Sequence, residues 1–399
     1  MLLSKNLTFF SVLMLLVVLG QFATELYLPS MPSMATYLHV NINMIQLSIA
    51  VYVFGFAIGS MVYGTLSDKF GRRPIILTCL LVGFIGGLVC CFSFSIDSLL
   101  IGRLIQGLGF SGGSVVARSI TKDISETREE LAKVSSTMGI LYASAIAFAP
   151  IIGGYIEKYM FWRMSFILLL VLAITTIALC WYKIPETNRN KRSLTMHVVL
   201  HDYIDVLTNR QFLLYNIISA SVLCGLVAYQ TMSSYLLQVR VGMLPDSFGY
   251  TALFITAALI SGGLINRFMM PRRGSEKMII IGCYLYISTS IIYIITGIFG
   301  LINIYIILAP IVIAVVASGI IYPNCSAGAM GVFDTKAGTA ASIYNCLQML
   351  GASIGSILVS LFHNANQLVL GVLFICIGGM SLFLARKLQV KVIREVTEV

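Results

Sequence analysis

Two charged residues stand inside apolar segments, where an ionised side chain is costly. Glu25 lies in ATELYLPSMP, one turn before Pro29, and Arg103 lies in LIGRLIQGLGF, three residues before Gln106. Charges within a membrane segment pair with one another or face a polar cavity. Burial favours a protonated glutamate whereas a nearby arginine favours the carboxylate, so these opposed effects can poise Glu25 for proton exchange. We expect the two residues to lie at one depth and to couple protons to conformational change.

Two simpler interpretations stay open for the same residues. Glu25 and Arg103 could form a static buried ion pair with no role in coupling. Arg103 could also extend along its aliphatic stem to the outer membrane surface, because it lies only about two turns from the start of its segment. A Glu25→Gln substitution, which removes the charge but keeps the size of the side chain, distinguishes proton coupling from both.

A turn rich in cations follows the second apolar segment, in the sequence GTLSDKFGRRP from Gly64 to Pro74. Gly71 can adopt the left-handed backbone conformation that a tight turn needs, and Pro74 suits the first turn of a following helix. A cytoplasmic loop that only carries positive charge would explain the cations but not the spacing of the other residues. We expect a functional turn built from Gly64, Asp68, Gly71, Arg72 and Arg73.

The elements that must position these residues are membrane-spanning helices. Of the residues, 58% are hydrophobic and 11% charged, and the mean hydropathy is +0.93, far from the composition of a soluble domain. A span needs about 20 apolar residues. We expect twelve, at 8–32, 44–66, 75–94, 97–117, 134–156, 163–183, 212–236, 248–268, 277–298, 302–323, 337–361 and 366–386. The first is too long for a signal peptide, carries Glu25 and lacks a small-residue cleavage site, so we expect it to be retained.

The basic residues predict the orientation of the chain. Of the 26 Lys and Arg residues, only Lys158, Arg163 and Arg240 fall on the minority side of the expected spans, with Arg103 inside one. Cytoplasmic loops carry the excess of positive charge, so both termini should be cytoplasmic. The net charge of +10 therefore reflects topology, and no nucleic-acid partner is expected.

The chain repeats itself across a long polar break. Residues 184–211 contain a basic cluster and a predicted surface helix, and they separate a first bundle at 1–183 from a second at 212–399. GTLSDKF at 64–70 matches GGLINRF at 262–268, each after the second span of its half, with Asn266 in place of Asp68. Inverted or parallel internal repeats are common in transporters. We expect an all-α membrane protein of two pseudo-symmetric six-helix bundles.

These motifs resemble the major facilitator superfamily. Gly64 to Arg73 fits its pattern G-x-L-x-D-x-x-G-R-[RK] between helices 2 and 3, and Leu100 to Gly107 fits L-x-x-R-x-x-Q-G in helix 4. The resemblance implies that Asp68 latches the cytoplasmic side by engaging nearby cations and a helix N-terminus of the second half. Since Asn266 replaces the acid, the second latch should be weaker. It also implies a substrate cavity, for which polar residues on the lining spans are candidates: Tyr52, Gln106, Tyr142, Tyr229, Gln230, Asn324, Asn345 and Gln348.

Within the superfamily, the chain is similar to drug/proton antiporters of the bicyclomycin-resistance (Bcr/CflA) group. Their first helix reads D-x-Y-L-P-x-x-P, where this chain has Glu25 in place of Asp, and their fifth ends in G-P-x-x-G-G. Pro150, Gly153 and Gly154 fit that ending and predict close helix packing, but Ala149 replaces a glycine. The resemblance implies a monomeric bacterial inner-membrane protein that exchanges protons for small amphipathic substrates. It implies no cofactor, because the proton gradient drives transport.

Other functions are compatible with parts of the sequence. A proton-coupled importer, or an exporter of one metabolite such as a siderophore, would carry the same motifs. A membrane enzyme would need clustered nucleophiles, bases or metal ligands at one depth, and a receptor or scaffold would usually carry a soluble domain. The nine cysteines show no metal-ligand spacing, so we expect neither a metal site nor a disulfide.

Overall fold

The computed structural model describes residues 7–125, 127–188, 196–333, 337–362 and 366–397, and they form helices joined by short connections. Among them are twelve helices long and apolar enough to cross a membrane, which confirms the predicted class. Each overlaps one predicted span. Several basic residues used to predict orientation lie outside the described residues: Lys5, Arg189, Lys191, Arg192 and Lys336.

Contacts divide the chain into two compact units. The first unit comprises residues up to Thr195 together with Leu244–Ala252, and the second comprises Met196–Met243 and Leu253 onward. The first nine residues of the segment that begins at Leu244 therefore pack with the first unit. The bundle boundaries at 183 and 212 stay predictions.

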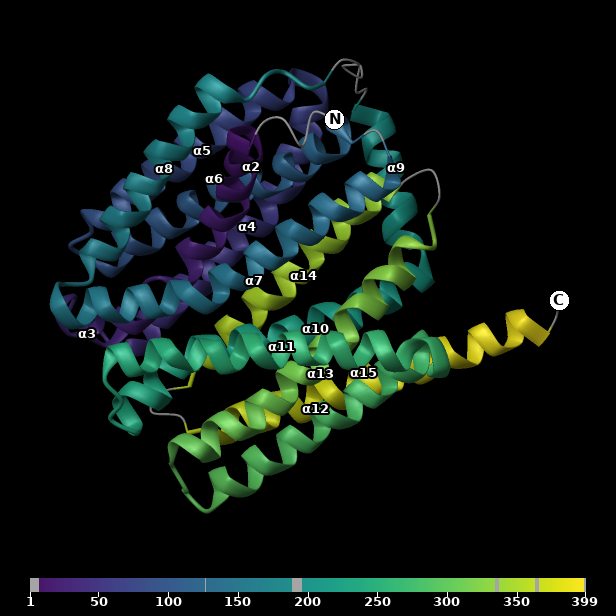
Figure 1. The fold of residues 1–399 in the computed structure, drawn as a ribbon. Coiled ribbons are helices and arrows are strands. Elements are labelled where there is room, and N and C mark those ends of the chain that lie inside the picture. The colour runs from purple at the N-terminus through teal and green to yellow at the C-terminus, as the bar shows by residue number, and fades with distance from the viewer. Residues whose placement is uncertain (1–6, 126, 189–195, 334–336, 363–365, 398–399) are drawn as a thin grey trace. The chain divides into compact units, whose positions relative to one another are not determined.

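In the first unit, α4 and α5 both pack along α6, as Figure 1 shows. The close contact is possible because these helices face one another with glycines: a methyl group on Gly55 would lie 2.5 Å from the Leu104 carbonyl oxygen. The elements of this unit are α2 (Leu7–Glu25), η1 (Leu28–Ser30), α3 (Met31–Tyr37), α4 (Ile42–Phe70), α5 (Arg72–Cys91), α6 (Ile96–Ile124), α7 (Arg128–Tyr159) and α8 (Arg163–Lys183).

In the second unit, α12 packs along α15 and α10 packs along α14. Its helix α9 lies where the sequence predicts a helix in the polar break. The elements are α9 (Met196–Thr208), α10 (Arg210–Ser234), the π-helical turn η2 (Tyr235–Arg240), α11 (Pro245–Arg273), α12 (Ser275–Ile298), α13 (Ile304–Met330), α14 (Ala337–Ser360) and α15 (Leu368–Thr397). The start of α11, up to Ala252, belongs to the first unit.

Local sequence explains where the helices that carry the candidate residues begin and end. The first span breaks at the predicted bend, because α2 ends at Glu25 and a 3-10 turn with Pro29 follows. Helix α6 begins with a capping box, in which Ser95 accepts a hydrogen bond from Ser98 N at 3.2 Å. Helix α5 instead begins after Gly71, whose φ of 109° suits only glycine.

Candidate functional site

Arg103 lies on α6 with 0% of its surface exposed. Its Nη1 donates to the carbonyl oxygen of Ala23 at 2.8 Å and to Oε1 of Gln106 at 2.6 Å. Its Nε and Nη2, and also Nε2 of Gln106, have no hydrogen-bond partner among the described residues. Nε and Nη2 form the edge of the guanidinium that binds a carboxylate in bidentate fashion. The helix therefore presents a fixed arginine with one bidentate edge unused.

Two tyrosine rings hold the Arg103 guanidinium. The ring centroids of Tyr27 and Tyr52 lie 4.4 Å and 4.2 Å from its Cζ, a distance at which a cation is attracted to the ring face. Each ring is itself anchored, since the Tyr52 hydroxyl donates to the Gly20 carbonyl at 2.8 Å and the Tyr27 hydroxyl lies 2.9 Å from Ser48 Oγ. Tyr52 and Gln106, predicted to face a substrate cavity, are therefore direct neighbours of Arg103.

Glu25 is the last residue of α2 and is 5% exposed. Its Oε1 accepts a hydrogen bond from Gln21 Nε2 at 2.9 Å, one turn earlier. Arg103 reaches this helix through the carbonyl of Ala23, two residues before Glu25. On α7, Tyr142 lies close enough to feel the charge of Glu25. The first unit thus brings Glu25, Arg103 and three of the predicted polar residues into one region.

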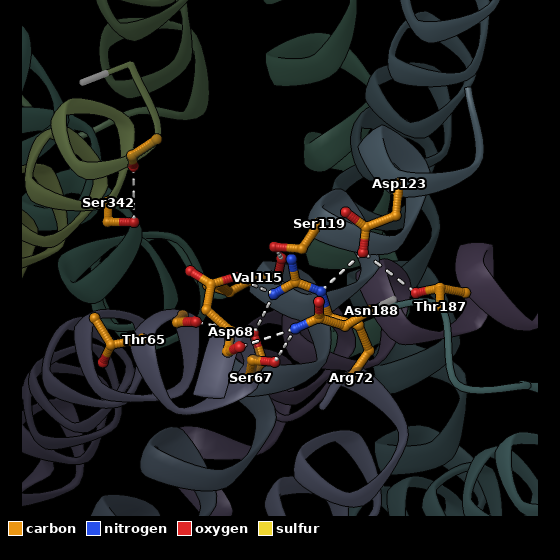
Figure 2. A network of polar contacts seen from close by, with 12 residues as sticks. Thr65, Ser67, Asp68, Arg72, Val115, Ser119, Asp123, Thr187, Asn188 and Ser342 are labelled. Atoms are coloured by element: carbon orange, nitrogen blue, oxygen red, sulfur yellow. Dashed lines mark hydrogen bonds and ion pairs between the residues drawn. The ribbon is translucent and has the colours of Figure 1, made fainter. Parts of the chain in front are cut away.

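A second cluster surrounds the turn at Gly71, and Figure 2 shows it. Nη1 of Arg72 contacts Asp68 Oδ1 at 2.5 Å and Ser67 Oγ at 2.7 Å, while its Nε contacts Asp123 Oδ2 at 2.9 Å. Asp68 lies in the last turn of α4, Arg72 begins α5 and Asp123 lies in the last turn of α6, so one guanidinium joins three helices. Arg73 takes a different partner, because its Nη2 donates to the Trp181 carbonyl at 2.6 Å.

The motif from Gly64 to Arg73 did not indicate Asp123. It lies 51 residues from Arg72, and no short pattern links them. Its side chain is 21% exposed, against 45% for Asp68. The available signal was topological: Asp123 lies at the end of the fourth span, on the side of the membrane where the turn between the second and third spans also falls.

The second unit contains a neutral counterpart of this cluster. Asn324 Nδ2 on α13 donates to Asn266 Oδ1 on α11 at 2.6 Å, and Ser275 Oγ at the start of α12 donates to Asn324 Oδ1 at 3.1 Å. These are the second, third and fourth spans of the half, as in the first unit. Asn324 is 2% exposed. Asn324 thus joins three helices, and its predicted place in a substrate cavity stays a prediction.

The remaining candidates in the second unit lie on α10 and α14. Gln348 Nε2 and the Tyr344 hydroxyl both donate to Ser219 Oγ, at 2.5 Å and 2.7 Å. Tyr229 is 6% exposed and its hydroxyl has no partner among the described residues, while Gln230 and Asn345 are partly buried. Ser219 and Tyr344 were missed because single hydroxyl residues are ordinary in membrane helices.

Two glycines of the fifth span lie against the backbone of other segments. A methyl group on Gly153 would overlap the carbonyl oxygen of Leu26. A methyl group on Gly154 would overlap the carbonyl oxygen of Pro245, a residue of the first unit. Pro150 lies inside α7. One turn beyond the glycines, Lys158 Nζ lies 2.6 Å from Asp246 Oδ2, also within the first unit.

One group of possible metal ligands lies on α9, although the sequence predicts no metal site. Ligand atoms of His201, Asp202 and Asp205 lie within 4.8 Å of one another. His201 Nδ1 is 3.3 Å from Asp205 Oδ2, one turn away, and both side chains are largely exposed. This is the geometry of an ordinary surface pair on a helix. All nine cysteines, each among the described residues, are free thiols.

Twelve helices long and apolar enough to span a membrane, with a buried arginine and a polar turn at the end of the second span, are the features of a polytopic membrane protein. The sequence profile of the Major Facilitator Superfamily matches residues 13–356. The chain belongs to this superfamily. Members of the superfamily are transporters and not enzymes, and they generally need no cofactor.

Relatives and solved structures agree with this assignment. The chain is 28% identical to multidrug resistance protein D of Escherichia coli, with 94% of each chain covered. It is 27% identical to a bicyclomycin resistance protein homolog of Haemophilus influenzae, with 87% of each covered. A solved structure of the xylose transporter of E. coli superposes with a TM-score of 0.74 at 15% identity, covering 96% of this chain and 98% of that one. The similarity to the bicyclomycin-resistance group is thereby confirmed.

Proposed function

We propose that this transporter exports drugs or other small amphipathic molecules in exchange for protons. Relatives over most of the chain are named for multidrug and bicyclomycin resistance, and a further one, of Pseudomonas aeruginosa, for chloramphenicol resistance at 28% identity. The observation that carries the coupling is Arg103, a buried cation whose bidentate edge has no partner among the described residues. An arginine held this way is prepared for a carboxylate.

In the proposed cycle, Glu25 is that carboxylate. When it is ionised, attraction to Arg103 holds one state of the transporter. Protonation from outside cancels the attraction and favours the opposite-facing state, in which substrate from the cytoplasm competes with the proton. Arg103 already reaches the end of α2 through the carbonyl of Ala23, two residues before Glu25, and this contact supports the exchange. Protein conformations that differ by a few kcal/mol are readily shifted by such a change.

Transport in everted membrane vesicles tests the proposal. Adding a substrate to energised vesicles should release protons for the wild type, whereas Glu25→Gln should bind substrate without proton release or uphill transport. Asp97→Asn, which neutralises an exposed acid at the start of α6, is the matched control and should behave as the wild type. Uphill transport by Glu25→Gln would refute the coupling role. Proton flow in the same direction as the substrate would instead indicate the importer.

We further infer a cytoplasmic latch at the turn. Its residues are Gly64, Asp68, Gly71, Arg72 and Arg73, and its partner in the second half stays a prediction. The proposed setting is a bacterial inner membrane, with both termini cytoplasmic, a monomeric chain in the lipid bilayer and the proton gradient as the only energy source. An exporter of one endogenous metabolite is the second candidate. A susceptibility panel of drugs and metabolites in a pump-deficient host separates it from multidrug export.

A further inference from the structure

The turn at Gly71 is held by a segment more than 110 residues later in the chain, directly after α8. Glu186 Oε1 accepts a hydrogen bond from the backbone N–H of Arg72 at 2.9 Å, and its Oε2 accepts one from that of Arg73 at 3.3 Å. The first N–H groups of a helix have no partner within it, and α5 has no side-chain cap of its own because its N-cap residue is Gly71. Glu186 supplies the missing acceptors, and its negative charge suits a helix N-terminus.

Gly71 fits this arrangement in two ways. Its φ of 109° excludes most other residues. In addition, a methyl group at this position would lie 2.9 Å from the carboxyl carbon of Glu186 and still closer to one of its oxygens. The glycine therefore leaves the room that the Glu186 carboxylate occupies.

The two residues after Glu186 bind the other sides of the same turn, as Figure 2 shows for Thr187 and Asn188. Asn188 Nδ2 donates to the carbonyl oxygen of Asp68 at 2.9 Å and more weakly to that of Ser67 at 3.4 Å, at the end of α4. Thr187 Oγ1 donates to Asp123 Oδ2 at 3.3 Å, the oxygen that also accepts from Arg72. Asn188 N donates back to Glu186 Oε1 at 2.9 Å.

Three consecutive residues thus bind the start of α5, the end of α6 and the end of α4. We propose that Glu186–Asn188 is a strap that sets the geometry of the latch, with Glu186 and Asn188 as its positioning residues. The strap is the first part of the chain segment that leaves the first unit for the second. Movement of this segment therefore acts directly on the turn. This inference rests on the latch role proposed above.

Hydrogen exchange of the purified full-length protein in lipid nanodiscs tests the contact independently of transport. Glu186→Ala should accelerate exchange of the Arg72 and Arg73 amides by about tenfold or more, because each loses a charged acceptor. Glu186→Gln, which keeps one accepting oxygen, should fall between. Lys183→Ala, which removes an exposed charge from the same stretch, should leave these amides unchanged. Unchanged exchange in Glu186→Ala, or equal acceleration throughout the chain, overturns the proposal.

Transport kinetics then test the positioning role. Asn188→Asp replaces the amide that donates to two carbonyls by a group that repels them, and it should lower the maximal rate several-fold without changing KM, because the latch lies outside the proposed substrate cavity. A raised KM with an unchanged maximal rate contradicts the role. If exchange responds as expected but no substrate is transported by the wild type, the proposed function fails while the strap stands.

Discussion

Asp123 should contribute more to stability than Asp68, although only Asp68 belongs to the recognisable motif. Both carboxylates bind Arg72, whose side chain is 9% exposed. The side chain of Asp68 is nearly half exposed, at 45%, whereas the side chain of Asp123 is 21% exposed and also accepts from Thr187. Water screens the first pair much more than the second. The comparison of Asp68→Asn with Asp123→Asn therefore isolates the effect of burial on one shared arginine.

The magnitudes follow from the two environments. An exposed ion pair contributes about 0.2 to 1 kcal/mol, and the asparagine oxygen at position 68 can still accept from Arg72. A hydrogen bond to a charged group with little exposure contributes about 1.5 to 3 kcal/mol. We expect Asp123→Asn to cost about 2 kcal/mol and Asp68→Asn about 0.5 kcal/mol. For a unit of this size, 1 kcal/mol lowers the Tm by roughly 2–4 °C.

Thermal unfolding in one detergent, with a double-mutant cycle on Arg72→Met, measures both couplings. The Arg72–Asp123 coupling should exceed the Arg72–Asp68 coupling by about 1 kcal/mol, and added salt should weaken the latter more. The reasoning is refuted if Asp68→Asn lowers the Tm as much as Asp123→Asn. It is also refuted if salt acts equally on both couplings.

Three further predictions concern the first unit. Tyr52→Phe should keep most of the transport rate because the ring over Arg103 remains. Tyr52→Leu should lower the rate about 5- to 30-fold by removing a contact of about 1–2 kcal/mol, and equal loss in both variants would assign the effect to the hydroxyl. Glu25→Ala should regain proton release when millimolar formate is added, with Glu25→Gln unrescued, in vesicle assays. Gly153→Ala should destabilise by about 1–3 kcal/mol through overlap with the Leu26 carbonyl, and an unchanged Tm would contradict this packing.

The spans could be predicted because a membrane imposes a minimum apolar length on every helix. Apolar length does not predict where a helix continues beyond the membrane segment. Helix α6 extends to Ile124 and α13 extends to Met330, in each case seven residues beyond the predicted end of the span. The extra turns of α6 carry Asp123. A hydropathy window does not find them because only one face of such a turn is buried.

The candidate site likewise contains some residues that the sequence predicts and others that it does not. Arg103 and Glu25 stand out because charges are rare inside apolar segments, and both are buried. Glu186 could not be predicted in the same way. It is an exposed residue in a polar connection, and its role depends on two backbone N–H groups 113 and 114 residues earlier in the chain. Contacts of this kind follow from the tertiary fold and leave no local pattern.

The polar clusters around Arg72 in the first unit and Asn324 in the second show how far the two halves of the repeat remain equivalent. In the first unit, Arg72 joins two carboxylates. In the second, Asn324 joins Asn266 and Ser275 by neutral hydrogen bonds of similar length. The internal repeat therefore has corresponding contacts in both units, but the contacts of Arg72 join charged groups whereas those of Asn324 join neutral ones. Neutral hydrogen bonds respond little to ionic strength, whereas ion pairs at the surface are screened. Added salt should therefore weaken the exposed contact between Arg72 and Asp68 more than the buried hydrogen bonds of Asn324.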